Sequence, residues 1–251
     1  MRFKKFTALL FIGILVNVHI MAQPVRVAVA ANAQSVLNKI KEDFFKKTGI
    51  AVEIISGSSG KLTTQIKNGA PYDLFLSADM PFAQDVYTSG FSLTKPKIYA
   101  SGSLIICSAT GADLNNWKKL IMDSKTGKVA VANPKLAPYG KAAVEALNHF
   151  GLYKGAEPQL VFGESISQVN TYVLKRVVAI GFTTESLVHE VPSSSGLKWL
   201  RIPASAFAPI EQGAVLLKHA KSKNYTNNKR FFDYLFSAEA KVIFTQFGYN
   251  V

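Results

Sequence analysis

Hydrophobic residues in the first hundred positions follow a pattern that alternates between strands and helices. Short apolar runs rich in β-branched residues predict strands at 25–30, 51–55 and 73–76. Between the first two runs the pattern predicts a helix that ends at Gly49 and has an apolar face of Val36, Leu37, Ile40, Phe44 and Phe45. This order of elements is typical of parallel strands that are joined by crossover helices.

A second set of elements follows a long apolar run at 98–107. The pattern predicts strands at 128–132, 159–162 and 177–182, and it predicts a helix after each of the first two. A late strand at 213–217 precedes C-terminal helices with apolar positions at Phe231, Phe232, Leu235, Phe236, Val242, Ile243 and Phe247. Strands and helices therefore alternate along most of the chain, which indicates an α/β protein.

The second set of elements is interpreted as an insertion into the first. We expect two α/β lobes, in which residues 23–100 and 209–251 form the first lobe and residues 101–208 form the second. The two segments that flank the insertion would be the hinge. Because ligands of open α/β sheets bind at the carboxyl ends of strands, we expect a ligand cleft between the lobes that closes about this hinge.

The N-terminal residues 1–22 have the composition of a secretory signal peptide. A basic start precedes an apolar run at 6–20, and the small residue Ala22 stands at the expected cleavage position. An uncleaved anchor helix is the alternative, although Asn17 interrupts the apolar run. No cysteine lies near the cleavage position, so the sequence does not support a lipid anchor. We therefore expect export to the periplasm.

The chain is basic, with 29 Lys and Arg residues against 16 Asp and Glu residues and a net charge of +13. Nucleic acid is the usual partner of such a charge, but export and the scattered placement of the basic residues argue against it. A positive electrostatic field that attracts a small anion explains the charge better than nucleic-acid binding does. The alternative is a solvated surface that merely has an excess of basic residues. Cys107 is the only cysteine, and its apolar surroundings in the sequence predict a buried small hydrophobe.

Four turns rich in small residues are the candidate binding site. They cover residues 30–33, 57–60, 137–140 and 164–168, and each lies between a predicted strand and a predicted helix. The start of a helix presents unpaired backbone N–H groups and the positive end of the helix dipole. Because two turns fall in each predicted lobe, we expect all four to surround one anion in the cleft.

The expected donors at these turns are neutral. Asn32 offers its amide and Ser59 its hydroxyl, whereas Tyr139 and Ile166 offer backbone N–H groups at helix starts. Ordinary helix capping by Asn32 and Ser165 is the alternative. Neutral donors favour an oxyanion that is fully deprotonated, because a protonated one needs an acceptor for its hydrogen.

Glu164 is the one carboxylate among the four turns, and it could accept a proton from a ligand such as monoprotonated phosphate. A solvent-facing position at the start of the helix, where a negative charge interacts well with the helix dipole, is the alternative that we favour. The anion site is therefore expected to consist of neutral donors.

Sequence signatures of catalysis and of metal binding are weak. His149, His189 and His219 are isolated and lack the spacing of metal ligands. The Gly-Ser-Ser-Gly segment at 57–60 is not the Gly-x-Ser-x-Gly nucleophile elbow, and no phosphate-loop motif occurs. We expect a binding protein without catalytic residues, resident metal or cofactor, and a hydrolase that uses Ser59 is the alternative outside this class.

Several short motifs give the chain a family resemblance. The most distinctive is Gly-Ala-Pro-Tyr-Asp-Leu-Phe-Leu-Ser-Ala-Asp at 69–79. Gly-Ser-Ser-Gly at 57–60, Asn-Pro at 133–134, Ala-Pro-Tyr-Gly at 137–140 and Gln-Gly-Ala at 212–214 add to it. With these motifs the chain resembles the periplasmic molybdate-binding proteins of ABC transporters over essentially the whole of residues 23–251.

The resemblance implies a type II periplasmic binding protein fold and molybdate or tungstate as the ligand. By position, the family's oxyanion contacts fall on Asn32, Ser59, Tyr139 and Ile166, with Ala31 as a further position. It also implies a monomer that delivers its ligand to a membrane ABC permease and is not an enzyme. A receptor for sulfate or another tetrahedral oxyanion is the alternative. Molybdate and tungstate share charge and shape, so the sequence does not rank them.

Overall fold

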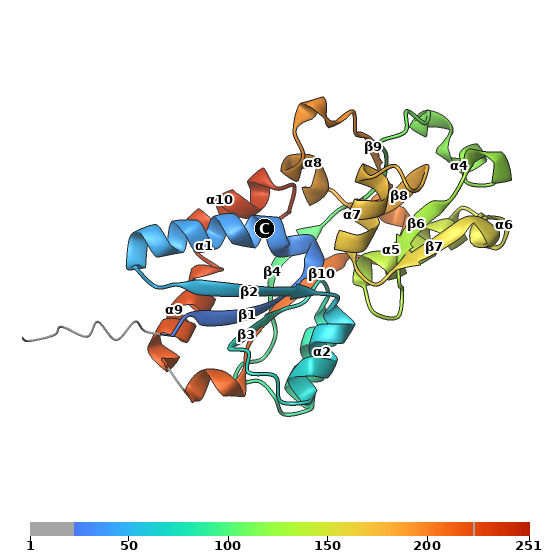
Figure 1. Ribbon diagram of the computed structural model, residues 1–251. Coiled ribbons are helices and arrows are strands. Elements are labelled where there is room, and N and C mark those ends of the chain that lie inside the picture. The colour runs from blue at the N-terminus through green and yellow to red at the C-terminus, as the bar shows by residue number, and fades with distance from the viewer. Residues whose placement is uncertain (1–22, 223) are drawn as a thin grey trace, which may run out of the picture.

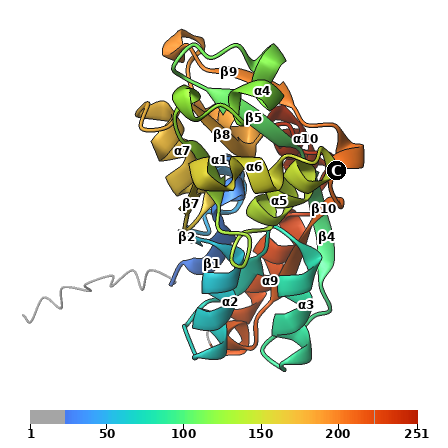
Figure 2. The same ribbon diagram turned by 90° about the vertical axis from the view of Figure 1, so that its right-hand side faces the viewer.

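The computed structural model of the chain describes residues 23–222 and 224–251 and contains two five-stranded sheets (Figure 1). The predicted signal peptide lies outside the described residues. Within the described residues, none of the helices combines the length and the apolar character needed to cross a bilayer. Figures 1 and 2 show that each sheet and its helices form a separate lobe, so the predicted two-lobe α/β fold is confirmed.

The first sheet has the strand order β2-β1-β3-β10-β4. Its strands β1, β2 and β3 are parallel, as the crossover pattern predicts, whereas β10 runs antiparallel to both β3 and β4. The strands of this sheet are β1 (Val25–Ala30), β2 (Val52–Gly57), β3 (Leu74–Leu76), β4 (Lys97–Gly102) and β10 (Ile210–Leu216).

Helices cover both faces of the first sheet, because successive side chains of a strand point to opposite faces. Val25, Val27 and Val29 of β1 pack with one group of helices, whereas Ala28 packs with the other. The first group is α1 (Gln34–Thr48), α9 (Tyr225–Tyr234) and α10 (Ala238–Gln246). The second group is α2 (Ser59–Lys67) and α3 (Met80–Thr88).

The second sheet has the order β7-β6-β8-β5-β9 and one hydrophobic core. Its strands are β5 (Leu104–Ser108), β6 (Val129–Ala132), β7 (Leu160–Gly163), β8 (Ile180–Thr184) and β9 (Lys198–Arg201). Its helices are α4 (Trp117–Leu120), α5 (Pro138–His149), α6 (Tyr153–Ala156), α7 (Ile166–Leu174) and α8 (Ser186–Glu190). Cys107 is fully buried in β5, as expected, and burial raises the pKa of its thiol to about 12.

The chain crosses between the two sheets at two places. β4 ends at Gly102 and β5 begins at Leu104, so the apolar run at 98–107 forms two strands in different sheets. The return crossing runs from the end of β9 to the start of β10. The lobe boundaries that we propose, after residues 100 and 208, lie close to these crossings.

Two strands of the second sheet differ from the sequence pattern. The strand expected at 177–182 begins only at Ile180. Arg176 adopts a left-handed conformation with φ of 57°, which ends the turn after α7. The next residue, Val177, is exposed and lies outside the strand. β9 is not predicted by the pattern. It is a short strand on the edge of the sheet with charged, exposed residues at both ends, and such strands lack a clear apolar alternation.

Candidate functional site

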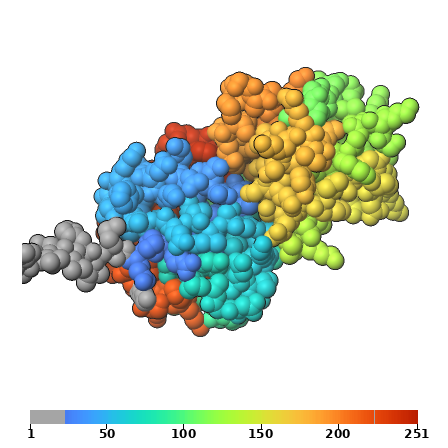
Figure 3. All heavy atoms as spheres, in the orientation of Figure 1, coloured from blue at the N-terminus to red at the C-terminus, as the bar shows by residue number. Residues whose placement is uncertain are grey.

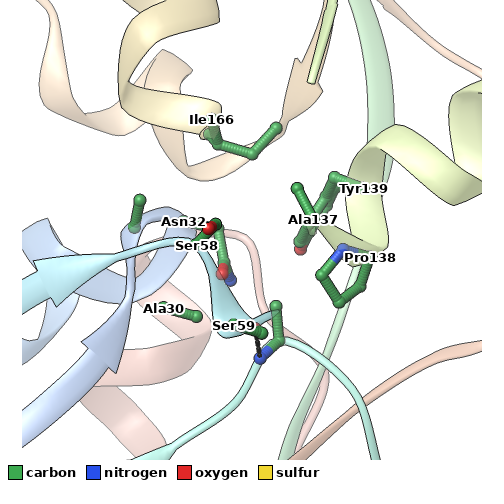
Figure 4. Close-up of a pocket in the computed structure, with 10 residues that line it drawn as sticks. Ala30, Asn32, Ser58, Ser59, Ala137, Pro138, Tyr139 and Ile166 are labelled. Carbon is green, nitrogen blue, oxygen red and sulfur yellow. Dashed lines mark hydrogen bonds between the residues drawn. The ribbon is translucent and has the colours of Figure 1, made fainter. Parts of the chain in front are cut away.

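The turns that follow β1, β2, β6 and β7 meet between the two lobes around a small cavity (Figure 4). All five positions expected from the sequence line this cavity, namely Ala31, Asn32, Ser59, Tyr139 and Ile166. The remaining lining residues are Ala30, Ser58, Ala78, Ala137 and Pro138. The room inside it for a water-sized sphere is about 10 Å³, whereas pockets for drug-sized ligands occupy about 300–1,000 Å³. The cavity is therefore of a size that suits a small ion.

Asn32 lies in the short 3₁₀ helix η1 (Ala31–Ala33), directly after β1, and is buried. Its side-chain Nδ2 donates to Oε1 of Gln212 at 2.8 Å and to Oη of Tyr249 at 3.3 Å. Its backbone oxygen accepts hydrogen bonds from the hydroxyls of Tyr249 and Ser186. Helix capping, the alternative role for Asn32, is not what the structure shows, because the N-cap residue of α1 is Ala33.

Ser58 and Ser59 form the turn between β2 and α2. Oγ of Ser59 accepts a hydrogen bond from the backbone N–H of Ala78 at 3.0 Å, which leaves the hydroxyl hydrogen of Ser59 available to a ligand. Ser58 is the N-cap residue of α2, but its side chain makes no capping hydrogen bond. Both serines are buried and line the cavity. The dashed line in Figure 4 marks the hydrogen bond from the backbone N–H of Ala78 to Ser59.

Tyr139 is positioned by the start of α5, where Pro138 occupies the first helical position and favours helix initiation. Its ring is buried, and its hydroxyl accepts a hydrogen bond from Nε2 of Gln212 at 3.4 Å. Burial raises the pKa of this hydroxyl well above its usual value, so it stays protonated at neutral pH. A side-chain Cβ at Gly102 would lie 1.8 Å from the Tyr139 hydroxyl, so glycine is required there.

Ile166 is the first residue of α7 and lies across the cavity from Ser59 in Figure 4. Its side chain is apolar, so any hydrogen bond that it gives to a ligand comes from its backbone N–H, which has no intrahelical acceptor in the first turn. The preceding N-cap residue, Ser165, makes no capping hydrogen bond through its side chain. Capping as the role of Ser165 therefore has no support in the structure.

The cavity lining contains neither a carboxylate nor a basic side chain. Its polar character comes from amide and hydroxyl groups and from the N-terminal ends of α2, α5 and α7, whose N–H groups and dipoles favour a negative charge. A site of this kind donates hydrogen bonds readily but offers few acceptors. The arrangement therefore suits a small anion that carries no proton.

Two contacts join the lobes at the edge of the cavity. The backbone N–H of Gly60 donates to the carbonyl of Leu136 at 2.9 Å. Nζ of Lys61 lies 2.7 Å from Oε1 of Glu164, and both side chains are about half exposed. Figure 3 shows the surfaces of the two lobes in contact in this arrangement. Glu164 is thus a partner of Lys61 at the protein surface and does not line the cavity.

A buried hydrogen-bond network behind the cavity was not expected from the sequence. Gln212 on β10 is its centre, because it accepts from Asn32 and Tyr99 and donates to Tyr139. Tyr249, close to the C-terminal end of the described chain, joins the network through Asn32. The one signal in the sequence is a glutamine at a position of β10 that alternates with the exposed Glu211, and that signal does not reveal its partners.

The bacterial extracellular solute-binding protein family matches residues 25–250. The chain belongs to this family. The molybdate-binding protein of Rhodobacter capsulatus is 36% identical over 223 residues, which are 88% of this chain and 86% of that protein. The solved structure of the periplasmic molybdate-binding protein of Azotobacter vinelandii matches with a TM-score of 0.83 and 30% identity, and the match covers 90% of this chain and 99% of that chain.

Membership in this family makes the protein a solute-binding protein and not an enzyme, as expected. The sulfate-binding protein of Mycobacterium tuberculosis matches with a TM-score of 0.73 but only 12% identity, over 90% of this chain and 86% of that chain, so it supports the fold alone. Among the described residues, no group of three or more His, Cys, Asp and Glu side chains is arranged to hold a metal ion.

Proposed function

We propose that this solute-binding protein captures molybdate, and also tungstate, in the cavity between its lobes. The observation that carries this proposal is the convergence of four turns from both lobes on one small cavity lined by neutral groups. The relatives from Rhodobacter capsulatus and Azotobacter vinelandii, which are named for molybdate binding, support this choice of anion.

The proposed contacts to the oxyanion come from Asn32, Ser59, Tyr139, Ile166 and Ala31. Burial of a dianion is favourable only when its oxygens receive hydrogen bonds. Backbone N–H groups at the helix starts and the hydroxyl of Ser59 supply donors on different sides of the cavity. The side-chain amide of Asn32 already donates to Gln212 and Tyr249. In this proposal Asn32 therefore contacts the anion through its backbone, and its side chain holds the turn in position through the hydrogen bond to Gln212.

The alternative ligand within the class is sulfate or another tetrahedral oxyanion. Molybdate and tungstate have the same charge and nearly the same size, so fixed donors interact with both alike. Sulfate is smaller than molybdate, so we expect the same donors to hold it less well. A protonated phosphate is disfavoured because no carboxylate lines the cavity to accept its hydrogen.

The proposed physiological role is delivery of the bound oxyanion to the permease of an ABC transporter in the periplasm. The signal-peptide pattern at residues 1–22 and the description of the Azotobacter relative as periplasmic support this location. The protein acts as a monomer in this proposal, because the ligand contacts all come from the two lobes of one chain.

The test is direct measurement of the bound anion. The protein is incubated with molybdate, tungstate, sulfate or phosphate at equal concentration, and its melting temperature is measured with the free anion present. The content of molybdenum or tungsten is measured after unbound ions are removed. Molybdate and tungstate should each remain bound in one equivalent and raise the melting temperature, since a ligand at about 100 times its dissociation constant adds about 2.7 kcal/mol to the stability. Equal stabilisation by sulfate would reject the choice of molybdate.

A further inference from the structure

The side chain of Ser58 makes no hydrogen bond although it is buried. Only 3% of the residue is exposed, and within the described residues its Oγ has no partner. Its position makes this unusual, because Ser58 is the N-cap residue of α2 and has the extended backbone conformation in which a serine normally caps a helix. The Ser58 hydroxyl therefore does not make the capping hydrogen bond to a backbone N–H of α2 that its position favours.

The cavity next to Ser58 offers this hydroxyl access to a ligand. Ser58 lines the cavity together with Ser59, Asn32 and Ile166 (Figure 4). Its neighbour Ser59 differs, because Oγ of Ser59 already accepts a hydrogen bond from Ala78. A buried hydroxyl without a partner costs stability, and a ligand in the cavity could provide the hydrogen bond that Ser58 lacks.

We propose that the hydroxyl of Ser58 donates a hydrogen bond directly to the bound oxyanion and is a determinant of affinity. A serine hydroxyl carries one donor hydrogen, and a fully deprotonated oxyanion offers lone pairs only, so the direction of this bond is fixed. The proposal rests on the proposed function and adds a contact to it. The free protein is less stable because of the unpaired hydroxyl, and the complex gains the bond that the free protein lacks.

Thr63 provides a matched comparison on the same helix. Its Oγ1 is also buried without a partner, with 4% of the residue exposed, but Thr63 does not line the cavity. The two hydroxyls therefore share burial and the lack of a hydrogen bond, and they differ in access to the ligand. Removing either one should stabilise the free protein, whereas removing the hydroxyl of Ser58 alone should weaken binding.

The experiment compares Ser58→Ala and Thr63→Val with the parent protein. Calorimetry measures the dissociation constant for molybdate, and thermal unfolding without ligand measures stability. Ser58→Ala should bind molybdate about ten- to a hundredfold more weakly, since hydrogen bonds to charged groups are among the strong ones. Its melting temperature without ligand should be equal to or higher than that of the parent. Thr63→Val should bind molybdate within twofold of the parent.

Two results would overturn the proposal. One is molybdate affinity of Ser58→Ala within twofold of the parent, and the other is a lower melting temperature of Ser58→Ala without ligand, which would reveal a structural hydrogen bond. Failure of the parent protein to bind molybdate is a different result, because it rejects the proposed function before Ser58 is considered. The three outcomes are distinguished by the same two measurements.

Discussion

The side-chain nitrogen of Asn32 donates a hydrogen bond to the side-chain oxygen of Gln212 at 2.8 Å, although 180 residues separate the two in the sequence. The other end of the Gln212 amide donates to the hydroxyl of Tyr139 in the second lobe. One fully buried amide thus connects a residue from each side of the cavity. The orientation of Gln212 fixes which atoms of Asn32 and Tyr139 remain free for a ligand.

Replacement of Gln212 by glutamate should make molybdate binding depend on pH. At pH 8 the carboxylate cannot donate to Tyr139, and its charge repels the anion, so affinity should fall at least about tenfold. At lower pH a protonated carboxyl regains a donor hydrogen, and affinity should recover. Calorimetry between pH 5.5 and 8.5 measures this. Gln84→Glu, which makes the same charge change at an exposed position of α3, is the control and should bind as the parent does.

Asn32→Asp should weaken molybdate binding by about a hundredfold or more. The change replaces the donor to Gln212 with a carboxylate that faces an acceptor oxygen and lies beside the anion. The free energy of unfolding should fall as well, because Asn32 is buried and does not cap α1. Titration calorimetry and urea unfolding measure both effects. The control is Asn148→Asp, which makes the same change on the exposed side of α5. If Asn32→Asp and Asn148→Asp bind molybdate with equal affinity, Asn32 has no part in the site.

Stability should decrease at alkaline pH because of buried tyrosines near the cavity. Burial raises the pKa of Tyr249 to about 12 and also raises the pKa values of Tyr99 and Tyr139. An unfolded tyrosine titrates near pH 10, so the stabilising effect is complete below about pH 10 and is lost as the pH rises toward 12. For Tyr249 the loss is on the order of 1 kcal/mol per pH unit in that window.

The variant that tests this pH dependence is Tyr249→Phe. Urea unfolding at pH 9, 10 and 11 should show a shallower loss of stability above pH 10 than in the parent. Tyr225→Phe, at an exposed position of α9, should keep the slope of the parent. Parallel curves for the parent and Tyr249→Phe would contradict the assignment of the alkaline loss to the buried tyrosine.

The ion pair between Lys61 and Glu164 should contribute modestly to closure of the lobes. Both side chains are about half exposed, and exposed pairs contribute little to stability. Glu164→Gln should therefore weaken molybdate binding by at most about fivefold in dilute buffer, and the difference should vanish at about 1 M salt. A loss of affinity greater than about fiftyfold would mean that Glu164 contacts the anion.

Closure of the lobes around the anion should make the parent protein more compact. Small-angle scattering should give a smaller radius of gyration with molybdate than without.

The sequence predicted the positions of the four turns because each position depends on local information. An apolar run, then small residues, then a helical pattern indicates where a strand ends, and the ends of parallel strands lie at one edge of a sheet. The partners of Asn32 could not be predicted in this way. Gln212 and Tyr249 lie 180 and 217 residues away, and only the folded topology brings them to Asn32.

The differences in the second lobe have a similar cause. Whether Val177 continues a helix turn or begins a strand depends on the left-handed conformation of Arg176, which a non-glycine residue adopts only in a particular context. The unpaired state of the Ser58 hydroxyl is also invisible in the sequence, where Ser58 has the properties of an ordinary N-cap. The hydrophobic pattern of the sequence determines where most strands and helices form. Contacts between distant segments determine which polar atoms are left without a hydrogen bond.

The topology of the first sheet has a consequence for the order in which the protein folds. β10 lies between β3 and β4, and Phe231 of α9 packs on Phe44 of α1 with ring centroids 5.0 Å apart. The first lobe therefore needs both ends of the chain, whereas β5 to β9 of the second lobe form one contiguous segment. Loop closure slows contacts between distant segments. Pulse-labelled hydrogen exchange during refolding should show protection in β5, β6 and β8 before it appears in β1 and β3.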